Sequence, residues 1–327
     1  MKIETAPPFR TTEDKPNFQI NEHVYAIDPH MYFALDRTKI YLISSEKKAL
    51  IDLSTSYTVE HILQGFEDIN HSIEDLDYLL ITHHHYDHCG CLSALAPKMP
   101  KAEICASLYA RYIIKNPDVR FPLTLFLYGK DFWTLAGDYK PLVGRDIRII
   151  SEGDVIDLGD DVRIRVIEMP GHEYGTLGYY EEKTKTLFVG DALGVFCGFY
   201  QPAAFKHGFT YFDFIRTLER TLSIDFEHIC WSHSGCFNRE EGKQLVRHAI
   251  GIAKLWREVV EKSAAENPTL EYIYDKVNEA GLINREFLEV YPDKLVRTGT
   301  YAMIGAFANS LEIEVPAELT AESWQSP

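Results

Sequence analysis

Four side chains of metal-ligand type follow a short apolar stretch, Tyr78–Thr82. They are His83, His85, Asp87 and His88. A short apolar stretch is typical of a buried strand, along which side chains alternate between two faces. We therefore expect His83 and His85 to point to one side and His84 to point away. The turn that follows would add the carboxylate of Asp87 and the imidazole of His88, so that the segment would supply ligands to two metal ions.

Three further candidate ligands stand just past other strand-like stretches. They are His172, Asp191 and His233. Active sites of layered α/β proteins gather at strand ends, so we expect these three to join the first four. Imidazole and carboxylate suit catalytic zinc, manganese or iron, which keep an open position for water. Two such ions roughly 3.5–4 Å apart can share a hydroxide and polarise a substrate oxygen.

The order of these residues resembles that of the metallo-β-lactamase superfamily. Within it, the pattern is similar to the branch of glyoxalase II, lactonases and ribonuclease Z. The resemblance covers about Val24 to Gly235. It implies an αβ/βα sandwich with the site along one edge. It also implies two divalent metal ions, with zinc expected first and iron or manganese as alternatives.

The resemblance further implies a role for each ligand. One ion would be held by His83, His85 and His172. The other would be held by Asp87, His88 and His233. Asp191 would bridge the ions, and Asp87 and Asp191 would be the catalytic carboxylates. Asp52 matches an aspartate that supports the ligands from behind, although an aspartate in a turn can also simply bond to nearby backbone.

Two departures from the family pattern leave the ligands in place. Glu173 stands where serine or threonine is common, and its charge could alter the preference for substrate or metal. His233 lies in a Ser-His-Ser-Gly sequence in place of Pro-Gly-His-Gly. Cys89 and Cys91 are expected to pack as small apolar side chains, because the ligand set is complete without sulfur. Thiolate ligation is the alternative.

Alternating strand-like and helix-like stretches would position these residues. Lys39–Ser44 and Lys48–Leu53 predict a hairpin, and Tyr57–Ile69 has the apolar spacing of a helix. Further strands are predicted at 102–106, 145–151, 162–169, 186–190 and 228–232, and further helices at 108–114 and 212–222. Alternation of this kind predicts an α/β fold. Together with the resemblance, this alternation predicts a four-layer αβ/βα metallo-β-lactamase sandwich over residues 17–238.

The sequence becomes helical after Asn238. Helical patterns are predicted at 239–264, 270–280 and 293–311. One side of the first pattern carries Leu245, His248, Ile252, Leu255, Val259 and Lys262. We expect residues 239–315 to form a C-terminal helical extension. It would either cap the site or build an interface, including a possible homodimer.

Composition limits the range of partners. The formal net charge of −16 over 327 residues repels phosphate backbones and disfavours nucleic acid as a partner. No apolar stretch approaches the roughly 20 residues of a membrane span. Residues 1–15 lack the apolar core of a secretion signal. We therefore expect a cytoplasmic protein that does not bind membranes and whose cysteines are reduced.

The main hypothesis is a metal-dependent hydrolase that cleaves an ester-like bond, preferably a thioester or lactone, with a metal-bridging hydroxide. The aromatic-rich stretches 121–133 and 196–214 could form an apolar pocket for a small acyl or lactone substrate, with core packing as the alternative. His207 could donate to an oxyanion or simply lie on the surface. The rival functions are a phosphodiesterase and a regulatory interaction protein that retains the fold.

Overall fold

Two β-sheets form the centre of the molecule. The computed structural model describes residues 16–33, 35–119, 137–196, 200–202, 210–233, 235–283 and 293–313. The first sheet contains, in spatial order, β1 (Phe18–Gln19), β2 (Val24–Ile27), β3 (Ile40–Ser44), β4 (Lys48–Ile51), β5 (Tyr78–Leu80), β6 (Glu103–Ala106) and β7 (Arg148–Ile149). The second contains β15 (Gly235–Asn238), β14 (His228–Trp231), β11 (Thr186–Gly190), β10 (Leu177–Glu181), β9 (Arg163–Glu168) and β8 (Val155–Asp157). A separate short pair joins β12 (Val195–Phe196) to β13 (Tyr200–Gln201).

The first sheet changes from antiparallel to parallel pairing at β4. The predicted hairpin is confirmed, since β3 and β4 pair antiparallel with Ser44 opposite Lys48. From β4 onward the neighbours β4, β5, β6 and β7 run parallel. Parallel neighbours need a crossover connection, and those crossovers carry helices and the histidine-rich loop. The predicted strand at 145–151 is shorter in the structure, where only β7 joins the sheet.

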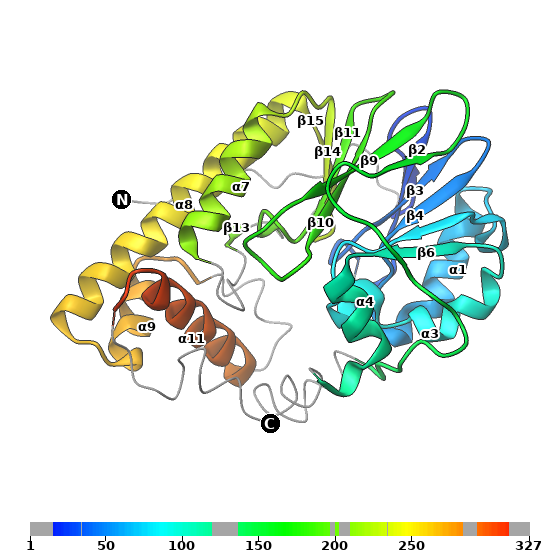
Figure 1. Cartoon of the computed structure of the whole chain (residues 1–327). Coiled ribbons are helices and arrows are strands. Elements are labelled where there is room, and N and C mark those ends of the chain that lie inside the picture. Colours follow the sequence, from blue (N-terminus) through cyan, green and yellow to red (C-terminus); the bar gives the residue numbers. More distant parts are fainter. Residues whose placement is uncertain are drawn as a thin grey trace.

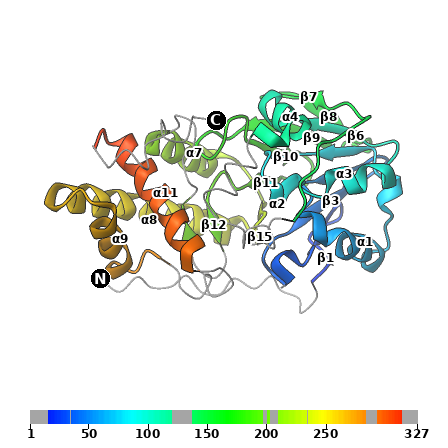
Figure 2. The ribbon, with the colours of Figure 1, turned by 90° about the horizontal axis from the view of Figure 1, so that it is seen from below.

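Helices cover the outer faces of both sheets, so the molecule has four layers (Figure 1). Beside the first sheet lie α1 (Val59–Asp68), α2 (Tyr86–Cys89), α3 (Leu92–Leu95) and α4 (Leu108–Lys115). Beside the second lie α7 (Tyr211–Ser223) and α8 (Arg239–Glu266), while α9 (Leu270–Glu279) and α11 (Asp293–Ser310) pack against α8. Figure 2 shows α8, α9 and α11 gathered at one end of the molecule, with α1 and α3 toward the other. This is the four-layer αβ/βα sandwich with a helical C-terminal part that was predicted.

Apolar side chains fill each space between these layers. Between the two sheets, the ring centroids of Tyr41 and Phe188 lie 5.3 Å apart. Strands of both sheets contribute to this buried cluster. A second cluster joins the first sheet to α1, α3 and α4. A third joins β11 and β14 to α7, α8, α9 and α11, with Trp256 stacked on Phe307. The C-terminal helices therefore share one core with the second sheet.

The buried side of α8 agrees only in part with the apolar side expected from the sequence, since Leu245 and Ile252 belong to both. Lys262 is exposed and Val259 is half-buried, whereas the neighbouring Val260 is fully buried. The prediction followed a seven-residue repeat, but a straight helix drifts about 20° per heptad relative to such a repeat. Over 28 residues this drift moves the buried face away from the predicted stripe. The buried face of α8 consists of Gly242, Leu245, Val246, Ala249, Ile252, Ala253, Trp256, Val260, Ser263 and Ala264.

Within the described part of the chain, every helix is too short or too polar to cross a membrane.

Candidate metal centre

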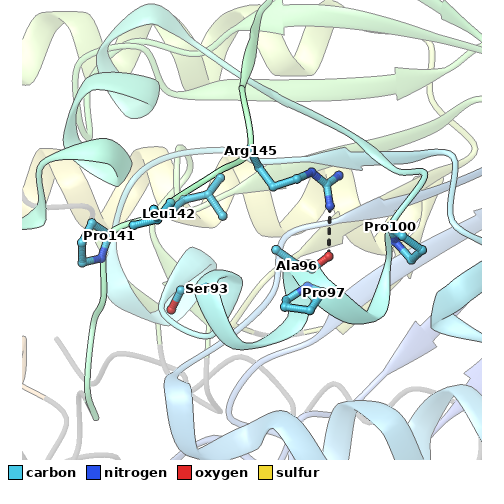
Figure 3. A pocket seen from close by; sticks show the side chains of 8 residues that line it. Ser93, Ala96, Pro97, Pro100, Pro141, Leu142 and Arg145 are labelled. Carbon is cyan, nitrogen blue, oxygen red and sulfur yellow. Dashed lines mark hydrogen bonds between the residues drawn. The ribbon is translucent and has the colours of Figure 1, made fainter.

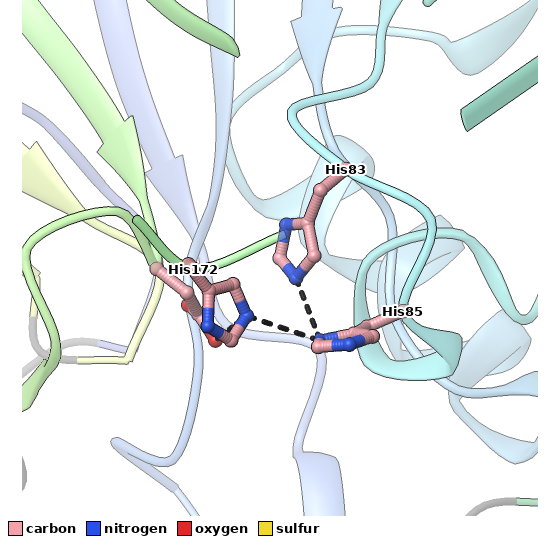
Figure 4. A group of neighbouring side chains, drawn as sticks. His83, His85 and His172 are labelled. Carbon is pink, nitrogen blue, oxygen red and sulfur yellow. Dashed lines mark hydrogen bonds and ion pairs between the residues drawn. The ribbon is translucent and has the colours of Figure 1, made fainter. Parts of the chain in front are cut away.

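Three histidines from two loops converge beside the end of β5. Figure 4 shows His83, His85 and His172 with their rings turned toward one another. Nδ1 of His85 lies 2.9 Å from Nε2 of His83 and 3.2 Å from Nε2 of His172. With Asp191 they offer four ligand atoms that all lie within 4.8 Å of one another. The structure thus brings together the residues predicted for the first ion.

A second cluster lies directly beside the first. Its members are Asp87, His88, Asp191 and His233, and their ligand atoms also lie within 4.8 Å of one another. Nε2 of His233 lies 3.1 Å from Oδ2 of Asp87 and 3.5 Å from Oδ1 of Asp191. Asp191 belongs to both clusters, so its carboxylate lies between them. All seven predicted ligands are therefore gathered at one place, although they come from four separate parts of the sequence.

Short local structures turn each ligand inward. Helix α2 begins at Tyr86, immediately after the extended residue His85, and brings Asp87 and His88 back toward the strand end. His172 follows Gly171, whose φ is +129°. A Cβ at Gly171 would lie 2.9 Å from Cα of Phe214, so only glycine fits between this loop and α7.

Asp52 supports the second cluster from behind, as the sequence predicted. Its Oδ2 lies 2.9 Å from Nδ1 of His88 and accepts a hydrogen bond from Oγ1 of Thr82 at 2.7 Å. Its Oδ1 accepts the backbone N–H of Thr82 at 2.7 Å. Because a carboxylate only accepts, Nδ1 of His88 is the donor and Nε2 is the ring nitrogen that faces the cluster.

Two other imidazoles are oriented in the same way. Nδ1 of His233 lies 2.8 Å from the carbonyl oxygen of Arg37, which can only accept. Nδ1 of His83 lies 3.1 Å from Oγ1 of Thr82, whose own hydrogen goes to Asp52. In both rings Nε2 therefore faces the cluster. Such outer partners fix the tautomer and orientation of metal-binding histidines.

The buried carboxyls and imidazoles of the site shift one another's pKa values. Burial opposes ionisation of Asp87 and Asp191, but the adjacent imidazoles of His88 and His233 outweigh burial and hold the pKa of both carboxyls well below the usual range. Burial also disfavours charge on His88 and His233, but Asp191 and Asp87 raise the pKa of both rings above 6.5. The two carboxylates therefore stay ionised and keep positive charge beside them.

The pKa of His83 moves the other way. Burial lowers it well below the usual value, and the neighbouring histidines, with His88 first, lower it further. His83 is thus neutral at physiological pH, which is the protonation state of an imidazole ligand.

Each of the two clusters has the composition of a group that could hold a metal ion. Among the described residues, Nε2 of His88 and Oδ1 of Asp191 are buried atoms without a well-directed hydrogen bond, although they lie 3.4 Å apart. Unsatisfied buried polar atoms are rare, and a missing ion is one of their ordinary causes. The donor set of imidazole nitrogen and carboxylate oxygen suits zinc, iron or manganese.

The neighbouring cysteines have the character of packed thiols. Cys89 lies 3.2 Å from the carbonyl oxygen of His85 and 3.1 Å from the hydroxyl of Tyr139. Burial raises the pKa of Cys91 to about 12 and that of Cys89 still further. Neither sulfur belongs to the groups of candidate ligand atoms among the described residues, in keeping with the expected packing role.

The expected aromatic pocket is described only in part. The stretch 121–133 and His207 lie outside the described residues. Of the stretch 196–214, Tyr200 and Phe214 are fully buried in the core beneath the helices, so these two rings pack in the core and do not line a pocket.

A separate hollow of about 380 Å³ lies beside α3 (Figure 3). It is lined by Ser93, Ala96, Pro97, Pro100, Pro141, Leu142, Val143 and Arg145. The guanidinium of Arg145 donates to the carbonyl oxygen of Ala96 at 3.0 Å and is thereby tied to the end of α3. None of the seven candidate ligands lines this hollow, so it is not part of the metal centre.

A model of the Metallo-beta-lactamase superfamily matches residues 35–227. The chain therefore belongs to the metallo-β-lactamase superfamily. A metallo-beta-lactamase family protein from Thermus thermophilus has a TM-score of 0.61 at 16% identity, covering 90% of this chain and 95% of that one. At such low identity this likeness shows the fold alone.

Two curated relatives support the glyoxalase II branch. The hydroxyacylglutathione hydrolase of Rhodospirillum rubrum is 28% identical over 167 residues, which are 51% of this chain and 52% of that protein. The hydroxyacylglutathione hydrolase of Bdellovibrio bacteriovorus is 30% identical over 155 residues, which are 47% of this chain and 49% of that protein. The chain thus spans about half the length of these relatives.

Proposed function

We propose that this chain is a hydrolase that uses two divalent metal ions to cleave an ester-like bond in a small acyl substrate, with thioesters and lactones preferred. The observation that carries the proposal is the position of Asp191, which belongs to both donor clusters. A shared carboxylate is suited to hold two ions at short separation. The names of the two hydroxyacylglutathione hydrolases favour a thioester as the first substrate to test.

In this proposal each cluster holds one ion. His83, His85 and His172 would hold the first, and Asp87, His88 and His233 would hold the second. Asp191 would be shared between them. Zinc is the first choice, and iron or manganese accept the same ligands. When bound, the ions supply Lewis-acid polarisation of a carbonyl oxygen and a strongly lowered pKa of water.

The residues of the chain prepare the site before any substrate arrives. The carboxylates of Asp87 and Asp191 stay ionised, so they retain cations and do not need to lose protons at neutral pH. Asp52 and the carbonyl of Arg37 orient His88 and His233 without touching the substrate. Burial of these groups strengthens every electrostatic interaction among them. A preorganised site of this kind favours charge that develops on a carbonyl oxygen during hydrolysis.

The test is an assay of the metal-loaded protein against three substrate classes. We expect turnover of a hydroxyacylglutathione thioester or a lactone, and little turnover of bis(p-nitrophenyl) phosphate. Asp191→Asn should lower kcat/KM by roughly 100-fold or more, because several kcal/mol of transition-state stabilisation depend on the bridged ions. Asp161→Asn, which alters an exposed turn, is the matched control and should behave like wild type.

Two results would overturn the proposal. The first is the absence of turnover for all three classes when elemental analysis confirms bound metal. The second is hydrolysis of the phosphodiester alone, which would assign the same centre to phosphodiester chemistry.

A further inference from the structure

His85 is contacted at both ring nitrogens. Nδ1 faces Nε2 of His83 and of His172, as described above. On the opposite edge of the ring, Nε2 lies 3.0 Å from Oε1 of Glu173. His85 therefore stands between the first cluster and a carboxylate that belongs to neither cluster.

The chemistry of the carboxylate decides the tautomer of His85. Oε1 of an ionised Glu173 can only accept a hydrogen bond, so Nε2 of His85 carries the hydrogen. Nδ1 then keeps its lone pair, and this nitrogen is the one directed at His83 and His172. A metal ion needs that lone pair, because ligating imidazoles bind through an unprotonated nitrogen.

Glu173 lies in a buried turn whose backbone is fixed by local hydrogen bonds. Its side chain is only 1% exposed. The hydroxyl of Thr176 donates to the carbonyl oxygen of Glu173 at 2.9 Å. The backbone N–H of Glu173 in turn donates to Oγ1 of Thr176 at 3.3 Å. Gly175 closes this turn with a φ of +69°. A buried carboxylate is costly unless it is paired, and the ring of His85 provides a partner.

The two clusters are supported in parallel ways. Asp52 contacts Nδ1 of His88 in the second cluster, and Glu173 contacts Nε2 of His85 in the first. We propose that Glu173 is a positioning residue of the first cluster, which fixes His85 with Nδ1 toward the ion and raises the affinity of this cluster for a divalent cation. The inference rests on the proposed two-ion site.

A third ion is the rival explanation for the same residues. Ligand atoms of His84, His85 and Glu173 lie within 4.8 Å of one another. However, a neutral imidazole has only one unprotonated nitrogen. His85 offers Nδ1 to the first cluster, so its Nε2 keeps the hydrogen and donates it to Oε1 of Glu173 at 3.0 Å. The chemistry of the ring therefore favours a positioning role.

The experiment measures metal binding directly, without an activity assay. Metal-free wild type, Glu173→Gln and Glu168→Gln are titrated with zinc in competition with a chromophoric chelator, and saturated samples are analysed for metal content. Glu168 is the matched control, because it is the last residue of β9, shortly before His172 in the sequence, and its side chain is exposed. We expect two equivalents in every variant. Glu173→Gln should weaken one binding step by about 10–100-fold, and Glu168→Gln should leave both steps unchanged.

Two further backgrounds assign the weakened step to a cluster. In His233→Ala, the first cluster keeps its three histidines, so Glu173→Gln should still weaken the remaining binding. In His172→Ala, the first cluster is broken, so the same substitution should have no further effect. Circular dichroism of each metal-free variant checks that the fold is retained.

The possible failures are distinguishable. If wild type binds fewer than two ions, the proposed function itself fails. If wild type binds two ions and Glu173→Gln binds them equally well, only the positioning role is overturned. If wild type binds three equivalents and Glu173→Gln binds two, Glu173 is a ligand of a third ion and the positioning role is overturned.

Discussion

Oδ2 of Asp52 lies 2.9 Å from Nδ1 of His88, and both side chains are only 1% exposed. Asp52 has a φ of +58°, a conformation that asparagine also tolerates. Asp52→Asn therefore changes the chemistry of the contact with little strain in the backbone. The variant therefore tests whether the second cluster depends on the contact between Asp52 and His88.

We expect Asp52→Asn to weaken zinc binding at one step by about 10–100-fold. Its Oδ1 can still accept the N–H of Thr82, but an amide NH₂ in the place of Oδ2 faces two donors, Oγ1 of Thr82 and Nδ1 of His88. Leaving such buried donors unpaired should also cost about 2–3 kcal/mol of unfolding free energy. Zinc titration and urea unfolding measure the two effects. An unchanged affinity would show that His88 does not depend on Asp52.

The loop that carries His172 gives a second test. Gly171→Ala should destabilise the protein by more than about 2 kcal/mol, because it combines positive-φ strain with a clash against the backbone of Phe214. The shift of the loop should also weaken metal binding in the first cluster. Gly153→Ala is the control: its φ is +86° and its Cβ would enter open space, so strain alone should cost about 1–2 kcal/mol. Equal losses of stability in the two variants would contradict the close approach.

The histidines predict how the stability of the metal-free protein depends on pH. Relative to an unfolded value of 6.5, the folded pKa of His83 is lowered, so its unfavourable contribution disappears as pH rises toward 6.5. The folded pKa values of His88 and His233 are raised, so their stabilisation is present below 6.5 and is lost as pH rises through the folded values. The thermal midpoint without metal should therefore pass through a maximum near pH 6.5.

Zinc should change that profile. The protons on Nε2 of His88 and His233 are those that a cation replaces, and metal binding to the folded state adds stability by mass action. The thermal midpoint of the zinc-loaded protein should accordingly stay high as pH rises from 6.5 to 8. Thermal scans across this range, with and without a chelator, compare the two forms. A parallel decline in both would contradict binding at these histidines.

The ligand positions could be predicted because each follows a short apolar stretch. A strand end is visible in a sequence as an apolar run followed by polar residues, as at Tyr78–Thr82 or before Asp191. The supporting contacts are different, because they depend on tertiary structure alone. The carbonyl of Arg37, which orients His233, is a backbone atom that any residue would provide. The sequence shows the charge of Glu173, but its contact with His85 depends on the tertiary structure.

Some strands carried no clear signal either. Strand β10 contains Gly178 and two adjacent tyrosines, so its alternation is weak, yet it pairs on both edges with β9 and β11. Strand β15 spans only Gly235–Asn238 and is defined by its pairing with β14. In both cases the neighbouring strands determine the structure more than the local sequence does.

Helix α8 provides a comparison between two adjacent and chemically identical side chains. Val260 is fully buried in the core cluster that α8 shares with the second sheet, whereas Val259 is half-buried and packs against the same cluster. Val260→Ala should cost about 2 kcal/mol of unfolding free energy, because two buried methyl groups are lost and a cavity remains. Val259→Ala should cost less than about 1 kcal/mol. Helix propensity changes equally in both variants, so it cancels in the comparison. Urea unfolding of the pair measures the difference, and a larger loss at Val259 would contradict the buried face of α8 described above.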